Sequence, residues 1–295
     1  MQNYKERLLE KTAEKKSHLC LGVDLHLKSL PSFFNKTIEK KNLEYALTKW
    51  TTALIEAASP LVPAIKFQSS FFEALGPFGF TLLKENIKTA KSKGLITILD
   101  AKRCDISSTM EAYGFSAFEQ LKADALTVVS YMGADVIRPL YQWMKQGHGV
   151  YSVFLSSNDS GYQRQSQTFS SKNDTLAESF HEEILKEISS KNLKPSFGLV
   201  VGVKAYEKNA GSLLPLSHEY NFLMPGMGFQ GGQITKNFDR LKTPKNSYLL
   251  PMSRSLSGIG DENLAQHLEE IRNFDDYQTF VSHRITDYQK KLGDD

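Results

Sequence analysis

The sequence predicts a (β/α)8 barrel, and three observations support that fold class. Eight short apolar runs recur along the 295 residues, and most are continuously apolar, as in strands buried on both faces of a parallel sheet. Segments with helical spacing of apolar residues separate several of these runs. A single barrel of this kind commonly occupies a chain of this length. A doubly wound open sheet is the structural alternative.

The predicted elements follow one another in chain order. The eight apolar runs predict strands at 19–24, 61–68, 94–102, 125–130, 150–157, 197–203, 220–226 and 247–253. Helical spacing is clearest in three groups of residues: Leu43, Leu47, Trp50 and Leu54; Leu83, Ile87 and Ala90; and Tyr277, Val281, Ile285, Tyr288 and Leu292. Between the sixth and seventh strands, the segment 204–219 is a weaker helix prediction.

No linker or change of composition divides the chain, so we expect one barrel domain over residues 1–295. Its two ends, residues 1–15 and 290–295, are expected to fray. The connection 158–174, after the fifth strand, is long and polar. Such a loop is either a mobile lid or disordered, and the sequence favours neither.

Charge and cysteine content exclude several classes of protein. With 36 basic and 33 acidic residues, the net charge is +3, which gives no reason to expect a nucleic-acid or membrane partner. Cys20 and Cys104 form no CxxC pair, as is typical of a reducing compartment. The charged N-terminal segment lacks a signal-peptide core, and no apolar run approaches the roughly 18 residues of a membrane helix. We therefore expect a soluble cytoplasmic protein.

The third predicted strand ends in a dense group of charges, "ILDAKRCDISST" at 98–109. Because alternate residues of a strand share a face, Asp100 and Lys102 are predicted to point the same way. Asp105 falls where the next helix should begin, a favoured place for a capping aspartate. In isolation, this cluster is best interpreted as a helix cap and a structural ion pair, with Arg103 in solvent.

Two neighbouring strands change that interpretation. Asp24 ends the first strand, and Lys66 lies inside the second, in "PAIKFQ". Aspartate and lysine are rarely buried without partners. Active sites of (β/α)8 barrels form at the carboxyl ends of the strands. The first three strands therefore predict one converging site in which lysines and aspartates alternate.

A glycine-rich loop follows the seventh strand. "PGMGFQGG" contains Gly226, Gly228 and Gly231, a formal match to G-x-G-x-x-G, but it does not lie in the first turn of a Rossmann unit. In barrels, the loops after strands seven and eight frequently bind phosphate. Arg254, just after the eighth strand, carries a guanidinium that matches a phosphate dianion. The two features together predict a phosphate site.

These motifs resemble one known family. "DAKRCDISST" is similar to the D-x-K-x-x-D-I-x-x-T signature of the orotidine 5′-phosphate decarboxylases, and that signature is highly specific. Four supporting pieces occur in the order that the family shows: "CLGVD", "AIKFQ", "MPGMGFQGG" and "SRS". The resemblance extends from about Leu19 to Leu256, with a layout most like the longer bacterial branch.

The resemblance implies a homodimeric barrel whose active sites are shared between subunits. By position, it implies catalytic roles for Lys66, Asp100 and Lys102 of one subunit and for Asp105, which with Ile106 and Thr109 would reach into the partner's site. It implies substrate contacts by Asp24 to the ribose, Ser157 to the pyrimidine, and Gln230 and Arg254 to the 5′-phosphate. Ser156 is an alternative to Ser157 because the local alignment can slip by one residue.

The implied reaction converts orotidine 5′-monophosphate to UMP and CO2, the last step of de novo pyrimidine nucleotide synthesis, without a metal or cofactor. Lys102 would stabilise the carbanion at pyrimidine C6 and donate the proton. Flanking aspartates favour the charged form of a lysine. One departure from the family is Cys104, which stands where glycine is expected and which a tight bend tolerates only if φ is negative.

Two alternative functions stay open. The chain could be a Mg2+-dependent sugar-phosphate barrel, of the hexulose-phosphate synthase or keto-gulonate-phosphate decarboxylase type. Such an enzyme should have a further acidic ligand near the first two strands, where this sequence has Gln68. The chain could also be a catalytically dead nucleotide-binding barrel, although its complete set of lysines and aspartates argues against that.

Overall fold

The computed structural model describes residues 2–168, 174–228, 236–243 and 246–293. Eight parallel strands follow one another in chain order and close into a barrel. They are β1 (Leu19–Val23), β2 (Ala64–Gln68), β3 (Ile96–Arg103), β4 (Ala125–Val128), β5 (Gly149–Leu155), β6 (Phe197–Val201), β7 (Asn221–Leu223) and β8 (Tyr248–Met252). Each strand lies in one of the eight predicted runs, give or take a residue at its ends, so the (β/α)8 fold class is confirmed. The single domain remains a prediction.

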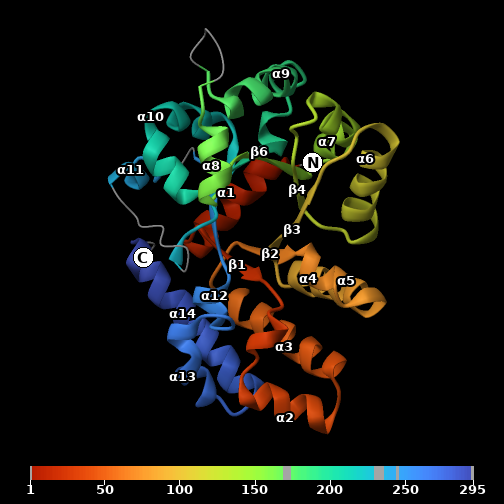
Figure 1. Ribbon diagram of the computed structural model, residues 1–295, viewed down its shortest axis with the longest axis vertical. Helices are drawn as coiled ribbons and strands as arrows, with labels where there is room; N and C mark the ends of the chain where they lie inside the picture. The colour runs from red at the N-terminus through yellow and green to blue at the C-terminus, as the bar shows by residue number, and fades with distance from the viewer. Residues whose placement is uncertain (1, 169–173, 229–235, 244–245, 294–295) are drawn as a thin grey trace. The chain divides into compact units, whose positions relative to one another are not determined.

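Helices precede the first strand, connect the strands and follow the last strand (Figure 1). They are α1 (Tyr4–Lys15), α2 (Ser32–Lys40), α3 (Leu43–Ala58), α4 (Ser69–Glu73), α5 (Gly76–Ser92), α6 (Ser107–Gly114), α7 (Tyr141–Lys145), α8 (Asp159–Gln165), α9 (Leu176–Ser190), α10 (Val203–Glu219), α11 (Lys236–Asp239), α12 (Arg254–Ser257), α13 (Ala265–Glu269) and α14 (Phe274–Leu292). The three groups with helical spacing form α3, α5 and α14, as predicted. Within the described ranges, no helix is both long and apolar enough to cross a membrane.

The chain divides into two compact units. One comprises residues 11–97 and 251–295 and contains β1, β2 and the helices α2 to α5 and α12 to α14. Here α14 packs along α3, and α2 also contacts α3 (Figure 1). Phe34 anchors this packing, with ring centroids 6.3 Å from Trp50 and 5.8 Å from Phe274. Tyr277 in α14 donates a hydrogen bond to the Ser257 carbonyl at 2.8 Å.

The other unit comprises residues 1–10 and 98–250. The first turns of α1 pack into it: Tyr4 and Leu8 are fully buried, and Arg7 pairs with the buried Asp124 at 2.9 Å. The N-terminal end is therefore helical where the sequence suggested fraying, because its apolar side chains are buried. At the other end of the chain, α14 likewise continues to the buried Leu292.

Two segments differ from their predictions. The weak helix prediction at 204–219 corresponds to α10, which is kinked at Asn209 (φ −126°) and contains Pro215. The Asn209 amide donates to the Ala205 carbonyl at 2.8 Å. The polar connection 158–174 begins with the helix α8, whose last residue, Gln165, is buried. Residues 169–173 of that connection lie outside the described residues.

Candidate active site

Strand β3 leaves its ladder with β4 at the point where the charged residues begin. Leu99 pairs with Leu126, but the next pair is Arg103 with Val128. Between these two pairs, β3 therefore contains two more residues than β4. Lys102 lies in this bulge and has φ +46°, a left-handed backbone conformation that residues other than glycine seldom adopt. Bulges of this kind redirect side chains at strand ends and are frequent next to active sites.

The bulge brings Asp100 and Lys102 together. The Lys102 ammonium donates to Asp100 Oδ1 at 2.7 Å. Asp100 is only 6% exposed, whereas the Lys102 side chain is 47% exposed. A buried carboxylate needs a charged or hydrogen-bonded partner, and Lys102 provides one. The buried Asp100 therefore holds the Lys102 ammonium in a position that is accessible to solvent.

A third side chain, Thr127 of β4, completes this cluster and was missed in the sequence. Its hydroxyl donates to Asp100 Oδ1 at 2.8 Å and accepts from the Lys102 backbone N–H at 3.0 Å. Thr127 is fully buried. The only signal in the sequence was a hydroxyl residue in the middle of the run "ALTVVS", which also ends in a serine.

The residues after β3 lie at the surface of the protomer. The prediction that Asp105 caps the following helix is wrong, because α6 begins at Ser107 with Ile106 as its N-cap and no side-chain cap. Asp105 instead accepts a hydrogen bond from the Ile106 N–H at 2.8 Å, where the chain turns before the helix. Ile106 is 40% exposed, and Thr109 is exposed as well.

The remaining residues of the β3 signature have ordinary surroundings. Cys104 is exposed and is absent from the described residues with positive φ, so the left-handed position falls on Lys102 instead. Burial and the neighbouring Asp105 raise the pKa of the Cys104 thiol. The Arg103 guanidinium lies over the Tyr113 ring at 4.9 Å, in keeping with a structural role.

Three further predicted residues lie at or near strand ends of the other unit. Asp24 follows β1, and its Oδ1 is buried with no hydrogen-bond partner among the described residues. Lys66 in β2 is 8% exposed and donates to Gln68 at 3.4 Å. Arg254 is the first residue of α12, directly after β8, and is half-buried. An unpaired buried carboxylate oxygen is costly, so Asp24 is suited to a ligand that brings a hydroxyl donor.

The glycine-rich loop after β7 is only partly described. Gly226 has φ +105° and Gly228 has φ +75°, conformations that favour glycine over any residue with a side chain. Gln230 and Gly231 lie outside the described residues.

The end of β5 distinguishes the two candidate serines. Ser156 donates both its backbone N–H and its hydroxyl to Gln165 Oε1, at 2.7 and 3.0 Å. Gly161 of α8 packs so closely that a Cβ there would lie 2.2 Å from the Ser156 hydroxyl. Ser156 is thus engaged by α8, which leaves the adjacent Ser157 as the better candidate for a ligand contact.

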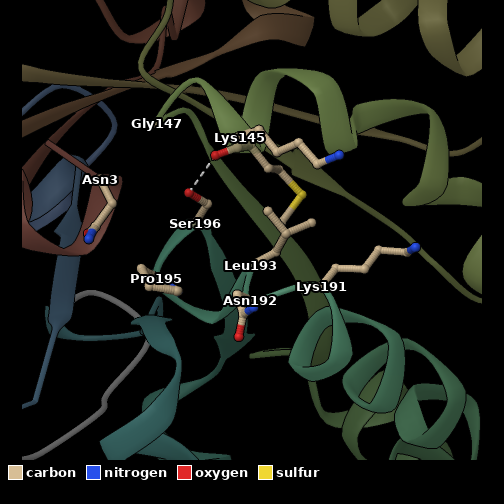
Figure 2. A pocket seen from close by; sticks show the side chains of 9 residues that line it. Asn3, Lys145, Gly147, Lys191, Asn192, Leu193, Pro195 and Ser196 are labelled. Atoms are coloured by element: carbon tan, nitrogen blue, oxygen red, sulfur yellow. Dashed lines mark hydrogen bonds between the residues drawn. The ribbon is translucent and has the colours of Figure 1, made fainter. Parts of the chain in front are cut away.

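Two cavities contain none of the predicted site residues. The first, of about 260 Å³, lies in the unit of residues 1–10 and 98–250 and is bordered by Asn3, Lys145, Lys191 and Ser196, whose hydroxyl bonds to the Met144 carbonyl at 2.8 Å (Figure 2). The second, of about 310 Å³, lies in the other unit and has an acidic border: Asp261, Glu262 and Glu269.

Comparison with known proteins identifies the family. The model of the orotidine 5′-phosphate decarboxylase / HUMPS family matches residues 17–255. Orotidine 5′-phosphate decarboxylases from Caldicellulosiruptor saccharolyticus and Herpetosiphon aurantiacus are each 31% identical to the chain, covering 79% and 87% of it and 82% and 90% of their own lengths. A crystal structure from Toxoplasma gondii, provisionally assigned as an orotidine-monophosphate decarboxylase, has a TM-score of 0.76 at 26% identity and covers 97% of this chain and 98% of that one. This chain therefore belongs to the orotidine 5′-phosphate decarboxylase / HUMPS family.

Proposed function

We propose that the protein decarboxylates orotidine 5′-monophosphate to UMP and CO2 in the cytoplasm, as the last step of de novo pyrimidine nucleotide synthesis. The observation that carries the proposal is the Lys102 ammonium held at 2.7 Å by the buried Asp100. Membership of the family and the names of the curated relatives support it.

The chemical difficulty is a carbanion at pyrimidine C6 with no adjacent electron sink. The bond from C6 to the carboxylate breaks, CO2 leaves, and the electron pair stays on C6. The Lys102 ammonium stabilises that pair and then transfers a proton to C6, giving UMP and a neutral amine that solvent reprotonates. A full charge 4 Å away contributes about 4 kcal/mol at an effective dielectric constant of 20, so one fixed ammonium is a large part of the stabilisation.

Asp100 has two roles in this proposal. As a carboxylate next to Lys102, it pairs with the ammonium at 2.7 Å before the reaction. As a buried group with little freedom to move, it also limits the positions that the ammonium can take. The reaction proposed here needs no metal or cofactor, because the ammonium provides both the charge and the proton.

The other predicted residues bind and orient the substrate. We assign Asp24 and Lys66 to the ribose hydroxyls, and the unpaired Oδ1 of Asp24 supports this because a hydroxyl would satisfy it. Ser157 is assigned to the pyrimidine because Ser156 is engaged by Gln165. The 5′-phosphate is assigned to Gln230 and Arg254. Phosphate binding is remote from C6, so its energy can order the site around the reacting atoms.

We further propose a homodimer in which Asp105, Ile106 and Thr109 complete the partner's site. The exposure of Ile106 and Thr109 in the single chain supports this, as do two large exposed apolar side chains on the segments that follow β3 and β4: Phe115 is 51% exposed and Met132 is 54% exposed. Mixing an inactive Asp105→Ala dimer with an inactive Lys102→Ala dimer should then restore about a quarter of the wild-type activity, since half of the exchanged dimers would have one intact site. No rescue despite demonstrated subunit exchange would contradict shared sites.

The activity is tested by following the loss of orotidine 5′-monophosphate absorbance with EDTA-treated protein. Turnover in the presence of chelator supports the proposal and rules out the hypothesis of a Mg2+-dependent sugar-phosphate enzyme. No turnover together with tight UMP binding would instead identify a catalytically dead nucleotide-binding barrel.

A further inference from the structure

We propose that Thr127 is a positioning residue for the decarboxylation, whose hydroxyl holds the Lys102 backbone and the Asp100 carboxylate in the arrangement that aims the Lys102 ammonium. The proposal deepens the proposed function and rests on it. Its basis is the geometry of one hydroxyl that contacts both members of the ion pair from a neighbouring strand.

The Thr127 hydroxyl takes the place of a backbone acceptor in the sheet. Where β3 bulges, between the pairs Leu99–Leu126 and Arg103–Val128, the Lys102 N–H has Thr127 Oγ1 as its acceptor at 3.0 Å. A buried backbone N–H left without an acceptor costs roughly 1–3 kcal/mol. Thr127 therefore stabilises the left-handed backbone of Lys102, a conformation that would otherwise relax.

The direction of both hydrogen bonds is determined by chemistry. A backbone N–H can only donate, so Thr127 Oγ1 accepts from Lys102. The single hydroxyl proton is then left for Asp100 Oδ1, the same oxygen that receives the Lys102 ammonium. The Thr127 hydroxyl thereby contacts both the Lys102 backbone and the Asp100 carboxylate that binds the Lys102 ammonium.

Threonine is well suited to this position. Its β-branched side chain has few χ1 rotamers, and here it is fully buried, so the hydroxyl is held in one direction. Loss of the hydroxyl would remove both contacts and so loosen the position of the ammonium. A displacement of about 1 Å at a catalytic group can cost about 100-fold in rate.

A purely structural role is the rival explanation, and Thr51 of α3 provides a matched control. Thr51 is also fully buried, and its hydroxyl contacts the Leu47 carbonyl and the Asn86 side chain, both at 3.0 Å. Thr51→Val therefore removes a buried hydroxyl of the same kind in a helix that carries none of the proposed catalytic residues.

The experiment compares Thr127→Val, Thr127→Ser and Thr51→Val by kcat, KM, UMP affinity and melting temperature. We expect Thr127→Val to lower kcat about 100-fold while KM and UMP affinity change by less than about threefold. Thr127→Ser, which keeps the hydroxyl, should recover kcat to within about tenfold of wild type, and Thr51→Val should lose melting temperature but retain kcat.

Three results would overturn the proposal: a wild-type kcat in Thr127→Val, an equal fall of kcat in Thr51→Val, or no recovery of kcat in a folded Thr127→Ser. If Thr127→Val does not fold, Thr127→Ala takes its place with the same expected fall in kcat. Failure of the proposed function is a different result, because the wild-type protein would then not turn over orotidine 5′-monophosphate in the same assay.

Discussion

Two buried polar networks in residues 98–250 have almost the same size but different designs. The first joins Asp100, Lys102 and Thr127 at the end of β3. The second joins Ser130, Ser152 and His181 between the β4 and β5 region and α9. Each consists of three side chains brought together from separate segments of the chain, so the comparison separates what a network needs for stability from what it needs for chemistry.

The second network is closed and neutral. His181 Nδ1 contacts the Ala177 carbonyl at 2.9 Å, and because a carbonyl can only accept, Nδ1 carries the proton. Nε2 is then an acceptor, with the Ser152 hydroxyl at 2.9 Å and the Ser130 hydroxyl at 3.3 Å, and the two serine hydroxyls contact each other at 2.5 Å. All three side chains are fully buried, and burial lowers the pKa of His181 to about 4.

The first network is charged and open on one side. Its carboxylate is buried, but its ammonium is half exposed, and its backbone includes the left-handed Lys102. A closed neutral network can only stabilise the fold, because none of its groups can reach a ligand. An open charged network held in a strained backbone costs stability and is retained where a ligand uses it. A serine beside a histidine resembles the nucleophile and base of an active site, but here both are buried. The accessibility of a charged group to solvent is the better indicator of the site.

The largest expected effect tests the open network. Lys102→Ala should lower kcat by more than about 10⁴-fold, because it removes both the charge that stabilises the carbanion and the proton that quenches it. The melting temperature should fall, because the buried Asp100 loses its ammonium partner, but Thr127 still donates to that carboxylate and the protein should remain folded. Turnover in the absorbance assay measures the effect, and Lys145→Ala, which removes an exposed lysine at the cavity of Figure 2, is the control. Near-wild-type turnover in Lys102→Ala would contradict the proton-donor assignment.

The second effect tests the closed network through pH. Because His181 has a folded-state pKa near 4, below the unfolded value of 6.5, its contribution to stability is complete above about pH 6.5 and is lost as the pH falls toward 4. The free energy of unfolding should fall by about 3 kcal/mol over that range from this residue alone.

Urea unfolding at a series of pH values measures this loss. In His181→Gln, which cannot titrate, the fall between neutral pH and pH 4 should be smaller by that amount. His283→Gln removes an exposed histidine of α14 and should leave the acid dependence as it is in the wild type. Parallel acid profiles for His181→Gln and the wild-type protein would show that the closed network is not the acid-sensitive element.

The smallest effect is expected for Ser152→Ala at neutral pH. The change removes the 2.9 Å donor to His181 Nε2 and leaves the Ser130 hydroxyl at 3.3 Å as its partner, which should cost about 1 kcal/mol in the free energy of unfolding. Catalytic rate should not change, because no member of the closed network reaches the site. Ser190→Ala, which removes an exposed hydroxyl of α9, is the control for stability. A fall in kcat without a fall in stability would show that the two networks are coupled, and the contrast between them would fail.

Much of the architecture was predictable from local patterns. All eight strands were visible as apolar runs because both faces of a parallel sheet are buried, and α3, α5 and α14 were visible because their apolar residues recur at helical spacing. The helix α10 was harder, since Asn209 and Pro215 interrupt its pattern. The N-terminal helix α1 was missed because its buried residues, Tyr4 and Leu8, lie among many charges.

The sequence by itself determined the fold class and placed Asp100 and Lys102 on one face of a strand, because strand alternation is a local property. The β3 signature was also sufficient to indicate the family. Only the tertiary structure decided how that pair is held. The bulge against β4, the left-handed backbone of Lys102 and the hydroxyl of Thr127 all depend on which residues of two separate strands lie opposite each other. The register between strands is a non-local quantity, which no periodicity within a single segment encodes.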